Sequence, residues 1–219
     1  MVRLAVGALL FDMDGVLLDS RPVVERTWRR WADRHRLDVD PILAIAHGRR
    51  TRDTLRLTVP HLATDHEVDW LDAAELDDFE GIGPIPGANA LLARLPPIRW
   101  TVVTSAGRDL AARRLSAVGL ALPDHAVTSE DVGRGKPAPD GYLLGANRLG
   151  VDPADCLVVE DAPPGIEAGQ AAGARVLGVT TTHQRAQLAR ADYLVPDLRF
   201  IRVVAGGAGL EAIVGETPA

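Results

Sequence analysis

Lysine and cysteine are almost absent from this chain of 219 residues. The sequence contains one lysine, Lys136, so 23 of its 24 basic residues are arginines, and it contains one cysteine, Cys156. A lone cysteine cannot form an intrachain disulfide, and we expect Cys156 to be a small core residue. The single lysine raises the question of why one position requires a compact ammonium when every other basic residue is a planar guanidinium.

Long apolar runs are also missing. No stretch of about 18 apolar residues is present that could span a bilayer. The apolar run within the amino-terminal MVRLAVGALLFDMDG is short and ends in acid, unlike a secretory signal. We therefore expect a cytoplasmic protein with no membrane partner. The net charge of −6 gives no basic field for a polyanion, so we expect no nucleic-acid partner either.

The chain has enough apolar residues, 47%, to bury a sizeable core. Short apolar segments alternate with segments of helical pattern. The predicted strands are 4–11, 99–104, 126–128, 156–160, 175–179 and 193–195, and the predicted helices are 88–95, 108–118, 140–149 and 165–172. This alternation is typical of an open α/β fold, in which helices cover a parallel sheet and ligands bind beyond the carboxyl ends of the strands.

Residues 18–86 have a different pattern, which predicts an all-helical insert after the first strand. Its first helix follows Ser20, and GIGPIPG at 81–87 reads as the linker back to the sheet. We therefore predict a core of residues 1–17 and 87–219 and a small helical cap of residues 18–86. The segment after Val204 is expected to be partly disordered, and we assign it no function.

Four acidic residues follow predicted strands. Asp12 and Asp14 end the first strand in FDMDG, and Glu160 and Asp161 end a later one in VVEDAPPG. Neighbouring carboxylates repel each other, so they need a cation, a proton or a catalytic role, and oxygen ligands are what Mg²⁺ prefers. A solvated turn is the simple alternative for either pair. An EF-hand loop does not fit, because its glycine position falls on Leu17.

Two further strand ends carry polar groups. Thr104 and Ser105 in TSAGRD stand before a helix, where hydroxyl and amide groups can bind an anion, although such residues also cap helices for structural reasons. Lys136 in GRGKPAPDGY supplies a slim cation that fits between a carboxylate and a phosphate. A surface lysine left by chance is the alternative.

Taken in order, FDMDGVLLDS, VVTSAGRD, GKPAPDGY and VVEDAPPGIEAG resemble the four signature motifs of the haloacid dehalogenase superfamily, from about residue 6 to residue 183. The insert is similar in position and length to the helical cap of the β-phosphoglucomutase-like branch. Within that branch, the motifs look most like those of sugar and glycerol phosphate phosphatases. The resemblance implies a Rossmann-like open parallel sheet, a small all-helical cap, and hydrolysis of a small phosphorylated metabolite.

The resemblance also implies roles for particular residues. Asp12 would be the nucleophile that forms an aspartyl phosphate, and Asp14 would be the general acid and then the general base. Thr104 and the Ser105 amide would hold the phosphate. Lys136 would bridge the phosphate and the nucleophile, which answers why one slim cation is kept.

A Mg²⁺ site is implied in the same way. Its ligands would be the Asp12 carboxylate, the Asp14 carbonyl and the Asp161 carboxylate, with Glu160 in support. The chemistry would then consist mostly of positioning and charge neutralisation during in-line phosphoryl transfer.

Departures from relatives narrow the expected chemistry. Dehalogenating members lack the second aspartate of the first motif, and Asp14 is present. Phosphonate-cleaving members need a lysine in the cap, and this cap has none. Phosphomutases of the branch carry a histidine where this chain has Val24, which puts mutase activity in doubt. A phosphomutase and a non-catalytic binding module remain the alternatives to a phosphatase.

The cap contains one basic cluster, HGRRTR at 47–52. We expect His47, Arg49 or Arg50 to face the substrate, since caps of this branch close over the site. The alternative is a solvated loop whose arginines pair with the acidic residues of 65–80. We further expect a monomer or a weak homodimer.

Overall fold

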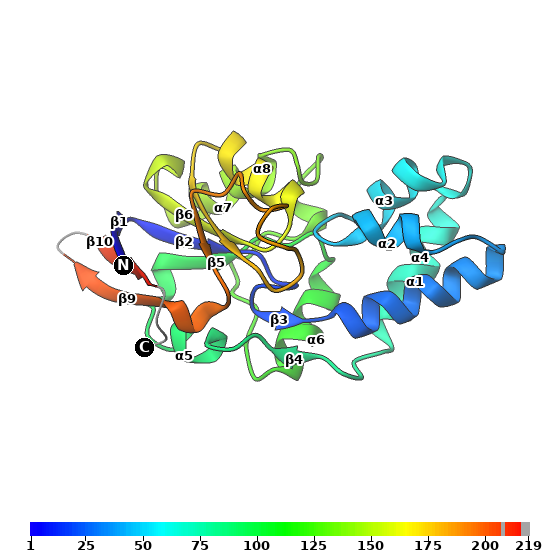
Figure 1. The fold of residues 1–219 in the computed structure, drawn as a ribbon, viewed down its shortest axis with the longest axis horizontal. Helices are drawn as coiled ribbons and strands as arrows, with labels where there is room; N and C mark the ends of the chain where they lie inside the picture. The colour runs from blue at the N-terminus through cyan, green and yellow to red at the C-terminus, as the bar shows by residue number, and fades with distance from the viewer. Residues whose placement is uncertain (207–208, 216–219) are drawn as a thin grey trace.

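The computed structural model describes residues 1–206 and 209–215, and a parallel sheet lies at its centre (Figure 1). The five strands run in the order β5-β2-β6-β7-β8. Their bounds are Ala8–Phe11 for β2, Trp100–Val102 for β5, Cys156–Glu160 for β6, Arg175–Val179 for β7 and Tyr193–Val195 for β8. The expected open α/β fold is therefore confirmed. The predicted strand 126–128 contributes only a single parallel bridge, between Val127 and Val103.

Helices cover the two faces of this sheet. They are α5 (Ala88–Leu92), α6 (Arg108–Ala117), α7 (Asp140–Leu149) and α8 (Pro163–Ala171). Elsewhere in the described chain, short 3-10 turns occupy Pro60–Leu62, Pro97–Arg99, Ser129–Asp131, Pro153–Asp155 and Leu198–Phe200. Alternate residues of β2 point to opposite faces: Leu9 and Phe11 pack toward α5 and α6, whereas Ala8 and Leu10 pack toward α7 and α8. Because both faces are covered, the strands are mostly apolar, as the sequence indicates. Among the described residues, no helix combines the length and the apolar character needed to cross a membrane.

The prediction of one strand over 4–11 is wrong, because the chain changes sheets at Gly7. Strand β1 (Val2–Val6) joins a separate antiparallel sheet with β9 (Ile201–Gly206) and β10 (Gly209–Val214), in the order β1-β10-β9. A side chain at Gly7 would meet Val151 at 2.6 Å, so the break needs glycine. The expected disorder after Val204 is wrong for β10, while residues 207–208 and 216–219 lie outside the described residues.

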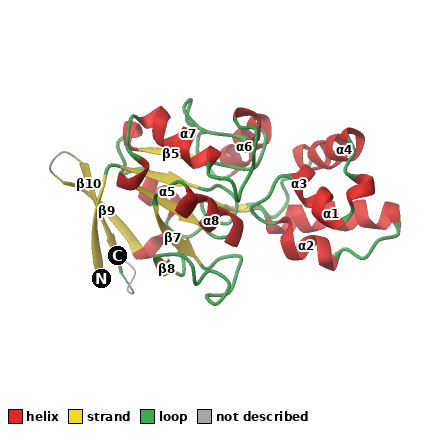
Figure 2. Ribbon diagram, turned by 90° about the horizontal axis from the view of Figure 1, so that it is seen from above, coloured by secondary structure: helices red, strands yellow, loops and turns green. Residues whose placement is uncertain are grey.

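The insert is helical, as predicted, and it is set apart from the sheet in Figure 2. It contains α1 (Arg21–His35), α2 (Asp40–Ala46), α3 (Thr51–Thr58) and α4 (Asp65–Leu76), and it is entered and left through the antiparallel pair β3 (Leu18–Asp19) and β4 (Gly83–Pro84). Its helices enclose a hydrophobic cluster of their own, centred on Trp28, Trp31, Ile42, Leu55 and Leu71. We propose that residues 18–86 form the cap domain, because this cluster is separate from the two clusters of the core.

The cap cluster predicts where the insert is sensitive to mutation. Leu71 on α4 is 1% exposed, so Leu71→Ala should lower the free energy of unfolding by about 2–5 kcal/mol. The measurement is urea denaturation followed by tryptophan fluorescence, to which Trp28, Trp31 and Trp70 contribute from the cap. Leu57→Ala is the control, since Leu57 is 60% exposed, and its effect should stay within about 0.5 kcal/mol. Equal effects of the two variants would contradict the description of the cap core.

Candidate active site

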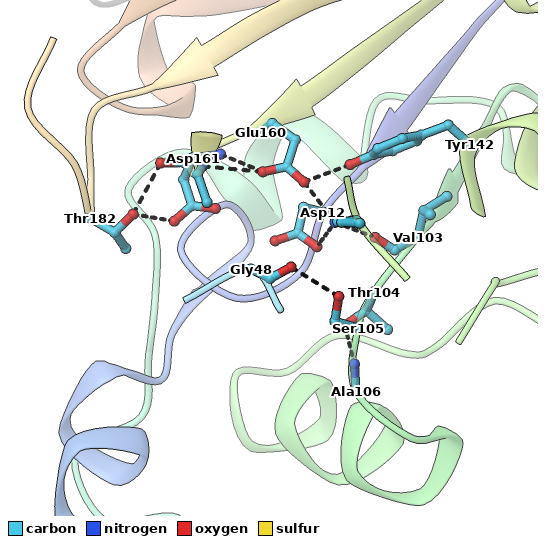
Figure 3. A network of polar contacts seen from close by, with 12 residues as sticks. Asp12, Gly48, Val103, Thr104, Ser105, Ala106, Tyr142, Glu160, Asp161 and Thr182 are labelled. Carbon is cyan, nitrogen blue, oxygen red and sulfur yellow. Dashed lines mark hydrogen bonds and ion pairs between the residues drawn. The ribbon is translucent and has the colours of Figure 1, made fainter. Parts of the chain in front are cut away.

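The four predicted motifs meet at the carboxyl ends of the central strands (Figure 3). Asp12 follows β2, Thr104 follows β5, and Glu160 and Asp161 stand at the end of β6. Strand β2 lies between β5 and β6 in the sheet, so these three strand ends are neighbours. The pairing continues past β2, since the Asp12 amide donates to the Val159 carbonyl at 2.9 Å. The nucleophile candidate is therefore fixed by the sheet itself.

Lys136 lies at the centre of the cluster and is 7% exposed. Its Nζ donates to Asp12 Oδ1 at 2.6 Å, to Glu160 Oε1 at 2.6 Å and to the Val103 carbonyl at 3.2 Å. An ammonium has three donors, and all three are used here. Burial alone would lower the pKa of Lys136, but the charges of Asp12 and Glu160 outweigh it and raise that pKa, so the side chain stays protonated.

Glu160 is fully buried, and both of its oxygens are engaged by the protein. Oε1 accepts from Lys136 and from the Tyr142 hydroxyl at 2.7 Å. Oε2 accepts from the backbone amides of Asp161 at 3.0 Å and Ala162 at 3.2 Å. This carboxylate therefore anchors Lys136 to the end of β6, and its hydrogen-bonding capacity is largely used by that task.

Asp161 differs from its neighbour in having a free oxygen. Its Oδ2 accepts from the Thr182 hydroxyl, whereas its buried Oδ1 has no hydrogen-bond partner among the described residues. One oxygen from each of Asp12, Glu160 and Asp161 can be chosen so that all lie within 4.8 Å of one another. Burial, with the neighbouring carboxylates adding to it, raises the pKa of Asp161, and burial likewise raises the pKa of Asp12 against the pull of Lys136. Such a group of buried carboxylates is suited to holding a cation.

Thr104 and Ser105 lie beside this cluster, as Figure 3 shows. The Thr104 hydroxyl accepts from the Ala106 amide at 3.1 Å and shapes the turn that precedes α6. The Ser105 hydroxyl donates to the carbonyl of Gly48 in the cap at 3.0 Å. The Ser105 side chain therefore links core to cap. The role in phosphate binding that the family resemblance implies belongs to its backbone amide.

Asp14 stands apart from the three buried acids. Its carboxylate is 27% exposed, and Oδ1 accepts from Nη1 of Arg114 at 2.9 Å. Asp14 and Asp12 both line a cavity of about 960 Å³ between cap and core. The side chain of Asp14 is thus placed to meet a ligand in the cavity rather than to join the carboxylate cluster.

The three cap residues predicted to face the substrate all line this cavity, but they differ in the contacts that their side chains make. Arg49 makes no side-chain hydrogen bond or ion pair to the described part of the chain. Arg50 is engaged, because its Nη2 donates to the carbonyl of Val132 at 3.0 Å. His47 lies edge-on to His183, with ring centroids 6.5 Å apart, and burial followed by the charge of His183 lowers the pKa of His47.

Several residues of the site were missed by reasoning from the sequence. Tyr142 lies within the GKPAPDGY motif, but nothing in the motif shows that its hydroxyl reaches Glu160. Thr182 follows β7, so its position after a strand end was an available signal. Arg114 lies in the last turn of α6 and Glu75 lies near the end of α4, and no local pattern marks either of them.

Buried carboxylates and one lysine lie at the carboxyl edge of an open α/β sheet, and a helical cap lies over them. This combination of fold and site is that of a class of hydrolases. The chain matches the haloacid dehalogenase-like hydrolase family over residues 6–173 and belongs to that family. The family resemblance seen in the four motifs is thereby confirmed.

The similar proteins include curated phosphatases. The chain is 43% identical to hexitol phosphatase A of Escherichia coli over 202 residues, covering 89% of this chain and 92% of that protein. It is 37% identical to glycerol-1-phosphate phosphohydrolase 2 of Saccharomyces cerevisiae over 225 residues, covering 96% and 89%. A solved structure of a β-phosphoglucomutase-like protein from Bacteroides vulgatus matches with a TM-score of 0.72 and 31% identity, covering 89% of this chain and 85% of that chain. The family match and the two phosphatase relatives confirm the predicted enzyme class, a phosphoric monoester hydrolase.

Gly165 at the start of α8 tests the packing around Glu160. A Cβ at this position would lie 1.7 Å from Glu160 Oε1, so Gly165→Ala must displace the carboxylate that holds Lys136. We expect the free energy of unfolding to fall by about 1–3 kcal/mol, measured by chemical denaturation. Gly83→Ala is the matched control, because no atom lies within 4 Å of its added Cβ, and it should change stability little. A Gly165→Ala variant as stable as the control would refute this account of Glu160.

Proposed function

We propose that this protein is a Mg²⁺-dependent phosphatase that hydrolyses a small sugar or polyol phosphate through an aspartyl-phosphate intermediate. The observation that carries the proposal is the placement of Asp12, whose carboxylate is held by Lys136 beside the unpartnered oxygen of Asp161. The named relatives act on hexitol phosphates and glycerol 1-phosphate by their descriptions, which supports a small polyol or sugar ester. We keep the predictions of a cytoplasmic enzyme and of a monomer or weak homodimer as part of this proposal.

The charges of the site fit a divalent cation. When all three carboxylates are ionised they face one ammonium, so two negative charges remain in a buried place. Asp12 and Asp161 would hold the metal, together with the Asp14 carbonyl, and Mg²⁺ is the expected ion because all of these donors are oxygens. Glu160 would act as a support, since its oxygens are engaged by Lys136, Tyr142 and two amides. The bound metal would neutralise charge on the phosphate oxygens during transfer.

The residues of this chain would divide the reaction between them. A carboxylate oxygen of Asp12 attacks phosphorus as the bond to the leaving alkoxide breaks, and Asp14 gives that alkoxide a proton. Water then attacks phosphorus and gives a proton to Asp14, the bond between phosphorus and the Asp12 oxygen breaks, and inorganic phosphate leaves. Lys136 keeps the carboxylate and the phosphate from repelling each other, and Thr104 and the Ser105 amide would hold the phosphate oxygens.

The cavity supports a small substrate with several polar groups. Its volume of about 960 Å³ leaves room for the phosphate and an attached polyol or sugar. Arg49 offers a guanidinium free of partners among residues 1–206 and 209–215, and His47 offers a half-buried imidazole that lines the same cavity. Arg50 is the weaker candidate, because a carbonyl of the core already occupies it.

Asp12→Asn tests the nucleophile. With Mg²⁺ and a panel of sugar and polyol phosphates, the wild type should release phosphate, and Asp12→Asn should be slower by about 10⁴-fold or more, because an amide cannot form the phosphoenzyme. The control is Asp155→Asn, an exposed carboxylate just before β6, which should keep the wild-type rate. Chelation should abolish release by the wild type, and added Mg²⁺ should restore it.

Other outcomes of that assay would point elsewhere. Release by Asp12→Asn at the wild-type rate would exclude the aspartyl phosphate. A wild type that releases nothing should next be given β-glucose 1-phosphate with a trace of bisphosphate. Isomerisation there would indicate a phosphomutase, and inactivity would favour a binding module.

Arg49→Ala tests the cap contact. If Arg49 binds the substrate, its loss should lower kcat/KM by about 10- to 100-fold, the range expected for a hydrogen bond from a charged donor. Arg29→Ala, an exposed arginine of α1 outside the cavity lining, is the control and should leave kcat/KM unchanged. Unchanged values for Arg49→Ala across the whole panel would remove Arg49 from the binding site.

A further inference from the structure

Arg114 is a buried core residue that joins the cap to Asp14. It lies on α6 and is 3% exposed. Its Nη1 donates to Asp14 Oδ1 and its Nη2 donates to Glu75 Oε2, both at 2.9 Å. Asp14 belongs to the first motif, whereas Glu75 belongs to α4 of the cap, and both line the cavity. One guanidinium is therefore shared between a carboxylate of the core and a carboxylate of the cap.

The two carboxylates determine where this guanidinium lies. Burial alone would lower the pKa of Arg114, but the charges of Asp14 and Glu75 outweigh it and raise that pKa, so the group stays charged. Its Nε is buried without a partner in the described part of the chain. The terminal nitrogens are thus the only part of the guanidinium that the surrounding described residues satisfy.

The sharing leaves one oxygen of Asp14 available. A guanidinium can bind both oxygens of one carboxylate through its two terminal nitrogens. Here Glu75 occupies Nη2, so Arg114 reaches Asp14 through Nη1 and Oδ1 alone. Asp14 Oδ2 makes no hydrogen bond to any described residue, and the side chain is 27% exposed toward the cavity.

This link differs from the other polar contacts between cap and core. Ser105 donates to the Gly48 carbonyl, and Arg50 donates to the Val132 carbonyl. Those contacts end on backbone carbonyls, and neither touches a carboxylate of the first motif. The Glu75–Arg114 pair reaches Asp14 directly, where helices α4 and α6 pack against each other.

We propose that Arg114 is a positioning residue for Asp14, and that Glu75 of the cap keeps Arg114 from engaging both oxygens of Asp14. When α4 lies on α6, Oδ2 is free to exchange a proton with the leaving-group oxygen. When α4 moves away, Nη2 loses its partner and can bind Oδ2, which masks the general acid. The inference rests on the proposed phosphatase function and adds to it a dependence of Asp14 on cap closure.

Leaving-group dependence provides the test. An alkyl phosphate needs a proton on its departing oxygen, whereas the 4-nitrophenolate of 4-nitrophenyl phosphate departs without one. We expect Glu75→Ala to lower kcat/KM, which reports phosphoenzyme formation and not its later hydrolysis, at least about tenfold more for glycerol or hexitol phosphates than for 4-nitrophenyl phosphate, since general acid catalysis contributes roughly 10²–10⁴-fold. Glu75→Gln keeps an acceptor for Nη2, so its effect should lie between those of the wild type and Glu75→Ala.

A control and a double-mutant cycle separate positioning from stability. Glu67→Gln alters another buried carboxylate of α4, one that binds Trp31 and His35 inside the cap, and it should not change the ratio of the two kcat/KM values. In Arg114→Lys, an ammonium replaces the fork, so removal of Glu75 from that background should have a smaller effect than in the wild type. Glu75→Gln keeps the test decisive if Glu75→Ala fails to fold.

The outcomes are distinct. A selective loss on alkyl phosphates, reduced in the Arg114→Lys background, supports the inference. Equal losses on both substrates in Glu75→Ala and Glu75→Gln overturn it and leave the proposed phosphatase intact. A wild type that hydrolyses neither substrate overturns the proposed function and this inference together.

Discussion

The site depends on one ammonium placed between carboxylates at the ends of adjacent parallel strands. Strands β2 and β6 pair directly, so Asp12 and Glu160 are brought together by the sheet, where burial makes their repulsion costly. Lys136 binds both at 2.6 Å and also holds the Val103 carbonyl beyond β5. Without this cation, the pairing of β2 with β6 would hold two buried carboxylates close together with no positive charge between them.

The same arrangement separates supporting groups from available ones. Glu160 has its oxygens engaged by Lys136, Tyr142 and two amides, so it stabilises the end of β6. Asp161 follows it in sequence but keeps a buried oxygen without a partner in the described chain. Adjacent residues of one motif therefore serve different purposes. The difference follows from the donors around each carboxylate: two side chains and two amides for Glu160, and the Thr182 hydroxyl for Asp161.

Local pattern predicted the elements whose signals are local. Strand 156–160 and helix 140–149 were predicted to the residue, because an apolar run or a glycine after the last turn marks each boundary. The break at Gly7 was missed because it depends on pairing between β1 and β10, which are about 200 residues apart in sequence. The residues of the four motifs could be expected to lie together because the carboxyl ends of parallel strands meet at one edge of a sheet. Arg114 and Glu75 were not, because their pairing exists only once cap and core meet.

The choice between lysine and arginine in this chain follows the arrangement of the acceptors. At Lys136, three acceptors converge on one nitrogen, and the planar fork of a guanidinium would not fit among them. At Arg114, one carboxylate comes from the first motif and the other from α4 of the insert, and two nitrogens held apart by a rigid plane can reach both. Arg148 likewise spans the Ala126 carbonyl and Asp131. Arginine thus connects separate elements of the fold, and the one lysine serves the point where charges must converge.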